Sequence, residues 1–374
     1  MSTQQLNLPL RERDVELLVV GAGQAGLATA CPAQQEGLQV LVVDAADGPG
    51  GSWPRYYESL TLFSPARFSV LPGMALPGDP DRYPARDEIT DYLRAYAARF
   101  EVPIRTSTRI TDLTWDGSAF IAVAGGEQLR ARAVVAATGG FGRPVIPDLP
   151  GARSFIGHLL HASAYRSPRD FAGQRVVVVG AGNSAVQIAV ELAQVATVSL
   201  TTRSPVRFTP QAPLGIDIHH WLRWSGLEAL PLGPKAASVV SVLDRGPYAA
   251  ALAAGRPDRR PMFTHFTTEG VTWPDGVQER VDAVILATGY RPDVGYLGGL
   301  DALDPTGWPV HCRGMSLTTP RLGYVGLPGQ TGFASATIRG VGADARRMVR
   351  RLTRDLATAT PRATTCRLPA LANR

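Results

Sequence analysis

The chain has 374 residues, 45% of them hydrophobic and 19% charged, which is typical of a globular protein with two or three domains. Its formal net charge of +6 comes from arginines spread along the chain and not from a basic block, which argues against nucleic-acid binding. Three cysteines without a Cys-x-x-Cys pair argue against a disulfide framework and a dithiol redox centre, and the lack of a signal peptide or long apolar run predicts a cytoplasmic protein without a membrane span.

The first elements along the chain predict a βαβ unit. Residues 15–21 are a short apolar run ending in glycine, as expected of a buried parallel strand. A helix is expected from about Gln24, and Pro32 should kink or shorten it. Residues 38–44 then predict a second strand that ends in an acid.

Three further segments follow this unit. Residues 50–84 are rich in glycine, proline and aromatic residues, which predicts a long functional loop. Residues 86–100 carry apolar side chains at three- and four-residue steps, which indicates an amphipathic helix. Residues 132–139 predict another buried strand, ending in Ala-Thr-Gly.

The same order of elements then repeats. We expect a strand at 175–180, a helix at 183–195, a strand at 197–203, an irregular segment at 205–262 and a strand at 281–289 that again ends in Ala-Thr-Gly. The repeat predicts an α/β fold with two Rossmann-like dinucleotide-binding domains, the second inserted into the first.

The first glycine-rich turn should hold the diphosphate of a dinucleotide, since it follows a strand and opens a helix. Gly21 permits the tight turn, Gly23 lets the backbone approach the diphosphate, and Gly26 lets helix and strand pack closely. Asp44, 23 residues after Gly21, suits the ribose hydroxyls of an adenosine. The turn reads Gly21-Ala22-Gly23-Gln24-Ala25-Gly26.

The second turn carries a base where the first carries an acid. Arg203 stands 23 residues after Gly180, and its guanidinium would bind a 2′-phosphate with two hydrogen bonds. The alternative is an ordinary solvated arginine at a strand end. We assign FAD to the first site and NADPH to the second. The second turn reads Gly180-Ala181-Gly182-Asn183-Ser184-Ala185.

A fingerprint lies between the two units. Residues 155–165 fit Phe-x-Gly-x-x-x-His-x-x-x-Tyr, with His161 and Tyr165 at its last two fixed positions. With the two glycine turns in the same order, the chain resembles the flavin-containing monooxygenases (class B flavoprotein monooxygenases), from about Val15 to Met348, and most of all their small bacterial and plant auxin-forming members. The resemblance adds these expected cofactor contacts: Gly51, Ser52, Trp53, Thr138, Gly139, Thr288 and Gly289.

Two departures from the family pattern restrict the subclass. Related Baeyer–Villiger enzymes carry tryptophan where Tyr165 stands, and animal amine and sulfide oxygenases carry an asparagine that the stretch 62–65 lacks. The fingerprint assigns His161 and Tyr165 an organising role at the linker, without direct proton transfer. His219 and His220 have no third ligand at a suitable spacing, so no metal site is expected.

The resemblance implies hydride transfer from NADPH to FAD, then activation of dioxygen as a C4a-hydroperoxyflavin and oxygenation of a small nucleophilic substrate. The residues expected to keep this site dry are Trp53, Tyr56, Tyr57, Leu62 and Phe63. One alternative is an FAD- and NADPH-dependent reductase or oxidase without oxygen insertion. Another is a non-catalytic nucleotide-sensing module.

The expected division of the chain has three segments. Residues 1–150 would form the first part of the FAD-binding domain, and 151–288 the NADPH-binding domain with the fingerprint linker. Residues 289–374 would return to the FAD-binding domain and end in a poorly ordered tail after about Leu356. The expected partners are a small-molecule substrate and dioxygen, with no nucleic acid and no membrane, and a homodimer is left open.

Overall fold

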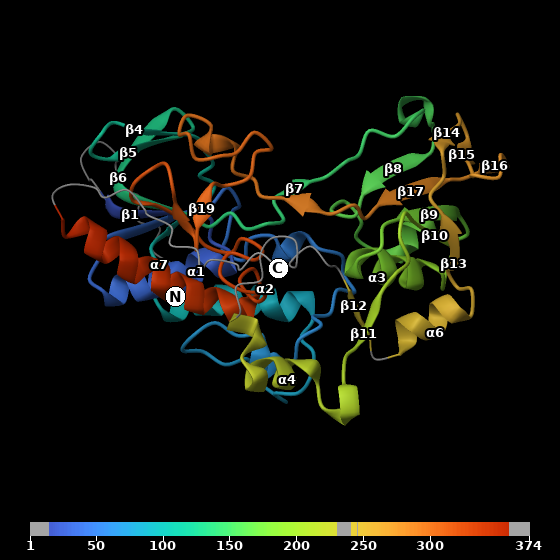
Figure 1. Ribbon diagram of the computed structural model, residues 1–374, viewed down its shortest axis with the longest axis horizontal. Coiled ribbons are helices and arrows are strands. Elements are labelled where there is room, and N and C mark those ends of the chain that lie inside the picture. The colour runs from blue at the N-terminus through green and yellow to red at the C-terminus, as the bar shows by residue number, and fades with distance from the viewer. Residues whose placement is uncertain (1–14, 230–240, 245, 359–374) are drawn as a thin grey trace, which may run out of the picture.

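The computed structural model describes residues 15–229, 241–244 and 246–358. They form two α/β units that stand side by side in Figure 1, the first at the left and the second at the right. The prediction of a poorly ordered tail falls almost wholly outside the described residues.

The first unit is built on a sheet whose central strands are all parallel, in the order β21-β6-β1-β2-β3. Two strands extend one edge in antiparallel fashion, and an antiparallel pair joins β6. The strands are β1 (Val15–Val20), β2 (Val40–Val43), β3 (Ile104–Arg105), β4 (Ile110–Trp115), β5 (Phe120–Ala124), β6 (Glu127–Ala136), β19 (His311–Cys312), β20 (Met315–Ser316) and β21 (Leu322–Tyr324).

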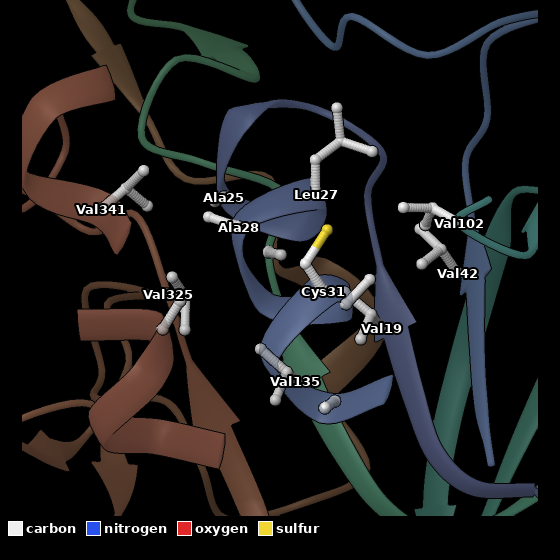
Figure 2. Close-up of a cluster of buried hydrophobic side chains, with 14 of the residues drawn as sticks. Val19, Ala25, Leu27, Ala28, Cys31, Val42, Val102, Val135, Val325 and Val341 are labelled. Carbon is white, nitrogen blue, oxygen red and sulfur yellow. The ribbon is translucent and has the colours of Figure 1, made fainter. Parts of the chain in front are cut away.

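Alternation along β1 gives this sheet two different faces. Leu17 and Val19 pack on α1 (Gln24–Gln35), α2 (Arg86–Arg99) and α7 (Ile338–Leu356). Figure 2 shows Val19 beside Cys31 of α1. Leu18 and Val20 face β4, β5 and the segment of the short 3-10 helix η7 (Gly295–Leu297). Because successive side chains of a strand point to opposite faces, a fully apolar strand is buried from both sides.

The second unit repeats this plan on a smaller sheet of five parallel strands, in the order β13-β10-β9-β17-β8. Val176 and Val178 of β9 face α3 (Asn183–Leu192), whereas Val177 and Val179 face a small antiparallel sheet. The five strands are β8 (His158–His161), β9 (Arg175–Val179), β10 (Thr197–Thr202), β13 (Asp258–Pro261) and β17 (Ala283–Leu286), and the small sheet holds β14 (His265–Phe266), β15 (Gly270–Thr272) and β16 (Gln278–Arg280).

The chain crosses between the units along a two-stranded ribbon. β7 (Arg143–Pro144) carries it out of the first unit, and β18 (Tyr290–Arg291) brings it back, antiparallel to β7. Figure 1 shows the bridge between the two units at the label β7. β21 then pairs with β6, so the second unit is inserted into the first, as predicted.

An excursion between β10 and β13 departs from the irregular segment predicted at 205–262. Its described residues hold a parallel pair, two α-helices and two short 3-10 helices, and α4 lies beneath the first unit in Figure 1. Its elements are β11 (Phe208–Pro210), η5 (Pro213–Gly215), α4 (Ile218–Ser225), η6 (Leu227–Ala229), β12 (Val242–Asp244) and α6 (Pro247–Ala253). The remaining 3-10 helices are η1 (Trp53–Arg55), η2 (Ala66–Phe68), η3 (Ala152–Ser154) and η4 (Pro168–Phe171).

Two expectations about single residues differ from the structure. The first helix continues past Pro32, because Cys31 and Ala33 are buried against the sheet and offset the one hydrogen bond that the proline removes. Cys312 is disulfide-bonded whereas Cys31 is a free thiol, a bond that the argument against a disulfide framework did not predict. Among the described residues, no helix is long and apolar enough to span a membrane.

A candidate two-nucleotide cleft

A cleft of about 1320 Å³ runs between the two units, at the carboxyl ends of the central strands of both sheets. Both glycine-rich turns line it, as do Asp44 and Arg203. In open α/β sheets, ligands bind outside the carboxyl ends of the strands. The structure thus places the two predicted nucleotide sites in one continuous space.

The first turn brings backbone atoms very close together. A Cβ on Gly21, whose φ is +111°, would lie 2.7 Å from the carbonyl oxygen of Ala137, and one on Gly26 would lie 1.7 Å from the carbonyl oxygen of Gly21. Gly23 faces Gly51 across the floor of the cleft, with 3.4 Å from its would-be Cβ to the Gly51 Cα. A side chain at either position would fill the space that a diphosphate needs above the N–H groups of α1, so the turn fits such a group.

Asp44 is held by the turn that it faces. Its carboxylate oxygens accept hydrogen bonds from the backbone N–H groups of Ala22, at 2.5 Å, and Ala46, at 2.8 Å. Each oxygen keeps a further lone pair, and the side chain lines the cleft, so its chemistry fits ribose hydroxyls.

Gln24 connects three parts of the first unit. Its Oε1 accepts from the indole N–H of Trp53 at 2.7 Å, and its Nε2 donates to the carbonyl oxygen of Ala336, two residues before α7, at 2.9 Å. Gln24 itself lines the cleft at the start of α1. Ala25 is buried behind it and, like Ser52, lines the cleft.

The second turn is built in the same way. A Cβ on Gly180 would lie 2.4 Å from the carbonyl oxygen of Ala287, and Ala185 stands where the first turn has its third glycine. The buried Oδ1 of Asn183 has no hydrogen-bond partner in the described part of the chain. An unused acceptor at the start of α3, beside Gly182 and Ser184 in the wall of the cleft, fits a polar ligand.

Arg203 lies just past β10 at the edge of the cleft and is exposed. Its guanidinium has no ion pair or hydrogen bond with any residue that the structure describes. This arginine is therefore free to bind a phosphate, which is what a 2′-phosphate site requires.

His161 ends β8 and ties the linker to the returning chain. Its Nδ1 accepts from the backbone N–H of Ser163 at 3.1 Å, so the ring proton is on Nε2, which donates to the carbonyl oxygen of Gly289 at 3.1 Å. Burial lowers the pKa of His161, although the bond to Gly289 opposes this. Both nitrogens of the neutral ring are thereby used, which supports an organising role.

Tyr165 lies in the core of the second unit and not at the cleft. Its ring is fully buried, and its hydroxyl donates to Glu191 Oε2 of α3 at 2.8 Å. It does not line the cleft, so any contribution to function passes through the packing of α3.

The two Ala-Thr-Gly strand ends both reach the cleft. Thr138, Gly139, Thr288 and Gly289 line it, and the Thr288 hydroxyl donates to the carbonyl oxygen of Val145 at 2.5 Å. Thr288 thus also fastens the outgoing chain to the returning one.

The remaining wall is largely aromatic. All five residues expected to keep the site dry line the cleft, and sequence reasoning missed Tyr290, whose ring meets that of His161 edge-on at 4.9 Å. Burial, with Tyr290 nearby, raises the pKa of Tyr56 to about 12. At neutral pH its hydroxyl therefore stays protonated. The five residues are Trp53, Tyr56, Tyr57, Leu62 and Phe63.

The histidines of α4 have a structural role outside the cleft. His219 is buried between Phe63 and Phe68, and its Nδ1 lies 2.7 Å from Asp217 Oδ1. No cluster of metal-ligating side chains occurs in residues 15–229, 241–244 and 246–358.

Comparison with known proteins agrees with this geometry. Residues 18–225 match the family model described as pyridine nucleotide-disulphide oxidoreductase. The chain is 35% identical to the uncharacterized CzcO-like oxidoreductase of Geobacillus kaustophilus, over 90% of this chain and 97% of that protein. It is 32% identical to the rice indole-3-pyruvate monooxygenase YUCCA1, over 74% of this chain and 77% of that protein.

A solved structure shows the same architecture over nearly the full length. The flavin-containing monooxygenase from Stenotrophomonas maltophilia superposes with a TM-score of 0.80 at 34% identity, covering 92% of this chain and 99% of that one. The architecture of two Rossmann-like units is thus shared with a flavin enzyme. The chain belongs to the class B flavin monooxygenase family, whose members are flavin-dependent oxidoreductases.

Proposed function

We propose that this protein is an NADPH- and FAD-dependent monooxygenase that inserts one atom of dioxygen into a small nucleophilic substrate. The observation that carries the proposal is the single cleft that holds both glycine turns, with Asp44 beside the first and an unpaired Arg203 beside the second. Bound FAD would accept a hydride from NADPH and activate dioxygen, which is chemistry that amino-acid side chains do not supply.

The first unit is proposed to bind FAD. The backbone N–H groups at the start of α1 would hold the diphosphate, Asp44 the ribose, and Gly51 would form the floor opposite Gly23. Thr138 and Gly139, at the next strand end, complete this side of the cleft.

The second unit is proposed to bind NADPH. The backbone N–H groups at the start of α3 would hold its diphosphate, and Arg203 its 2′-phosphate, whereas the unused Asn183 Oδ1 would accept from a donor group of the nucleotide. His161 and Thr288 are proposed to fix the crossing ribbon and so the position of this unit over the first. We also propose that the second unit begins near residue 150 and ends near residue 288. We further propose that the protein is cytoplasmic.

The aromatic wall is proposed to exclude water where oxygen transfer takes place. The indole N–H of Trp53 donates to Gln24, and Phe63 packs on the buried ring of His219. Both aromatic rings are therefore fixed in position by residues outside the substrate space. Rigid apolar groups around a reactive oxygen species limit its loss as peroxide.

To test the proposal, NADPH consumption by the FAD-loaded protein is measured in the presence of amines, sulfides, oxo acids and arsenicals as candidate substrates. Hydrogen peroxide is measured in parallel. A substrate that accelerates NADPH consumption and suppresses peroxide, with one atom of ¹⁸O from labelled dioxygen in the product, supports it. Reoxidation of the reduced protein that yields only peroxide, whatever compound is added, supports the oxidase alternative instead.

A further inference from the structure

One loop of the first unit is embedded in the second. Tyr57 follows η1 in the first unit, yet its side chain is 4% exposed and belongs to the hydrophobic core around α3. Its ring lies 5.9 Å from that of Tyr165, in a tilted arrangement. The loop therefore contributes to the core of a unit whose own strands begin a hundred residues later in the chain.

The hydroxyl of Tyr57 contacts side chains of the first turns of α3, among them Ser184 and Gln187. It donates to Oε1 of Gln187, which lies one turn into α3, four residues after Asn183. Burial raises the pKa of Tyr57 far above its ordinary value, so the hydroxyl is a permanent donor. Residues four apart share a face of a helix, so the contact falls on the face of α3 that carries the unused Asn183 acceptor.

The same loop is also anchored to the first unit. The Arg86 guanidinium at the start of α2 donates to the carbonyl oxygen of Tyr56 at 2.6 Å, and its backbone N–H donates to that of Leu60 at 2.9 Å. On the other side, the N–H of Glu58 donates to the carbonyl oxygen of Arg166 at 2.9 Å. The loop thus joins α2 to α3 as a connection separate from the chain crossings.

We propose that Tyr57 is a positioning residue, whose hydroxyl on Gln187 holds the nucleotide-binding start of α3 against the flavin side of the cleft. The proposal rests on the proposed function and adds a residue to it. Trp53 and Phe63 lie at either end of the same loop and line the cleft. The contact of Tyr57 with Gln187 would therefore fix the position of a nucleotide bound at α3 relative to these two aromatic side chains.

Binding of NADP⁺, which permits no turnover, to the FAD-loaded protein provides the test. Tyr57→Phe keeps the ring and removes the hydroxyl, and Gln187→Leu removes the acceptor. Each change should raise the Kd for NADP⁺ about two- to tenfold, the range for one neutral hydrogen bond. Because both changes remove the Tyr57–Gln187 contact, the double variant should lose less binding free energy than the sum of the two single variants.

Two further readouts separate positioning from general stability. The change in the flavin absorption spectrum on saturation with NADP⁺ should be diminished in Tyr57→Phe, and NAD⁺ should be weakened by the same factor as NADP⁺, since the contact is not at the 2′-phosphate. Tyr92→Phe is the matched control. Its hydroxyl is buried in the first unit, on the backbone of Leu71 and Met74, so this change should lower Tm and leave the Kd for NADP⁺ unaltered.

An unchanged Kd together with an unchanged flavin spectrum in Tyr57→Phe would overturn the positioning role while leaving the proposed function intact. Strict additivity of the two single changes would also overturn it. If the wild-type protein loaded with FAD binds no NADP⁺, the proposed function fails, and the positioning role fails with it.

Discussion

The carbonyl oxygen of Gly289 accepts two hydrogen bonds, one from His161 Nε2 at 3.1 Å and one from the backbone N–H of Val145 at 3.0 Å. His161 belongs to the fingerprint, Val145 to the outgoing chain and Gly289 to the returning chain. A single oxygen therefore joins the three segments at which the two units meet. This arrangement gives the fingerprint histidine a physical task that needs no proton transfer to substrate.

The burial of His161 predicts a pH dependence of stability. Burial holds the folded pKa of His161 below its ordinary 6.5, although the bond to Gly289 opposes this shift. The unfolded chain takes up a proton first, so stability is fully present above pH 6.5 and declines as the pH falls toward the folded pKa.

In His161→Asn, Tm measured from pH 8 downward should fall less steeply below pH 6.5 than in the wild type. The pKa of His311 is also lowered by burial, so His311→Asn serves as the comparison that separates the two contributions. Parallel Tm curves for His161→Asn and the wild type would refute the assignment.

Arg203→Ala should weaken NADPH binding by about one to two decades and leave NADH nearly unaffected. A charge-assisted hydrogen-bonded contact contributes roughly 1.5–3 kcal/mol, and the 2′-phosphate is the only group that distinguishes the two nucleotides. The KM values for both nucleotides measure the effect. Arg280→Ala, an exposed arginine of the small antiparallel sheet, is the control. An unchanged NADPH/NADH preference would contradict the role of Arg203.

Gly23→Val should abolish loading with FAD. The valine side chain would project toward Gly51, whose Cα already lies 3.4 Å from the would-be Cβ, and would occupy the floor of the first cradle. The ratio of flavin absorbance to protein absorbance after purification measures loading. Gly48→Val adds the same volume where a Cβ meets nothing within 4 Å and should remain yellow. A Gly23→Val protein fully loaded with FAD would contradict the role of the first glycine-rich turn in FAD binding.

Asp217→Ala should lower the free energy of unfolding by about 1–3 kcal/mol, because it leaves several buried donors without an acceptor. Although burial alone would raise its pKa, hydrogen bonds from His219, Tyr83 and Gln211 hold the pKa of Asp217 well below its usual 3.8. The stabilisation is therefore present above pH 3.8 and is lost as the pH falls below it. Denaturant unfolding at pH 7 measures the effect, with the exposed Asp47→Ala as control. Equal stabilities of the two variants would count against the network.

The sequence predicted the parts of the site that lie within one strand–turn–helix unit. Both glycine turns, Asp44 and Arg203 follow from spacing alone, because backbone geometry fixes where a residue falls 23 positions after the turn. The amphipathic pattern of α7, with Val341, Ala345 and Met348 on its buried face, is present in the sequence, but the glycines of the first turns of α7 weaken it as a helix signal.

Contacts between distant segments could not be predicted in this way. Tyr57 and Gln187 are 130 positions apart, and His161 and Gly289 are 128 apart, so no local period relates them. The excursion around α4 is likewise fixed by Asp217 and His219 packing on the first unit, which depends on how the two units meet.

The paired crossing strands have a consequence for how this chain can be taken apart. Since β7 and β18 run side by side, the intervening segment starts and finishes at one place, so a short linker between Arg143 and Arg291 would close the first unit without stretching it. The excised second unit would have its two chain ends next to each other. Its core around α3 would lack the side chain of Tyr57, so the excised unit would have a cavity at that position.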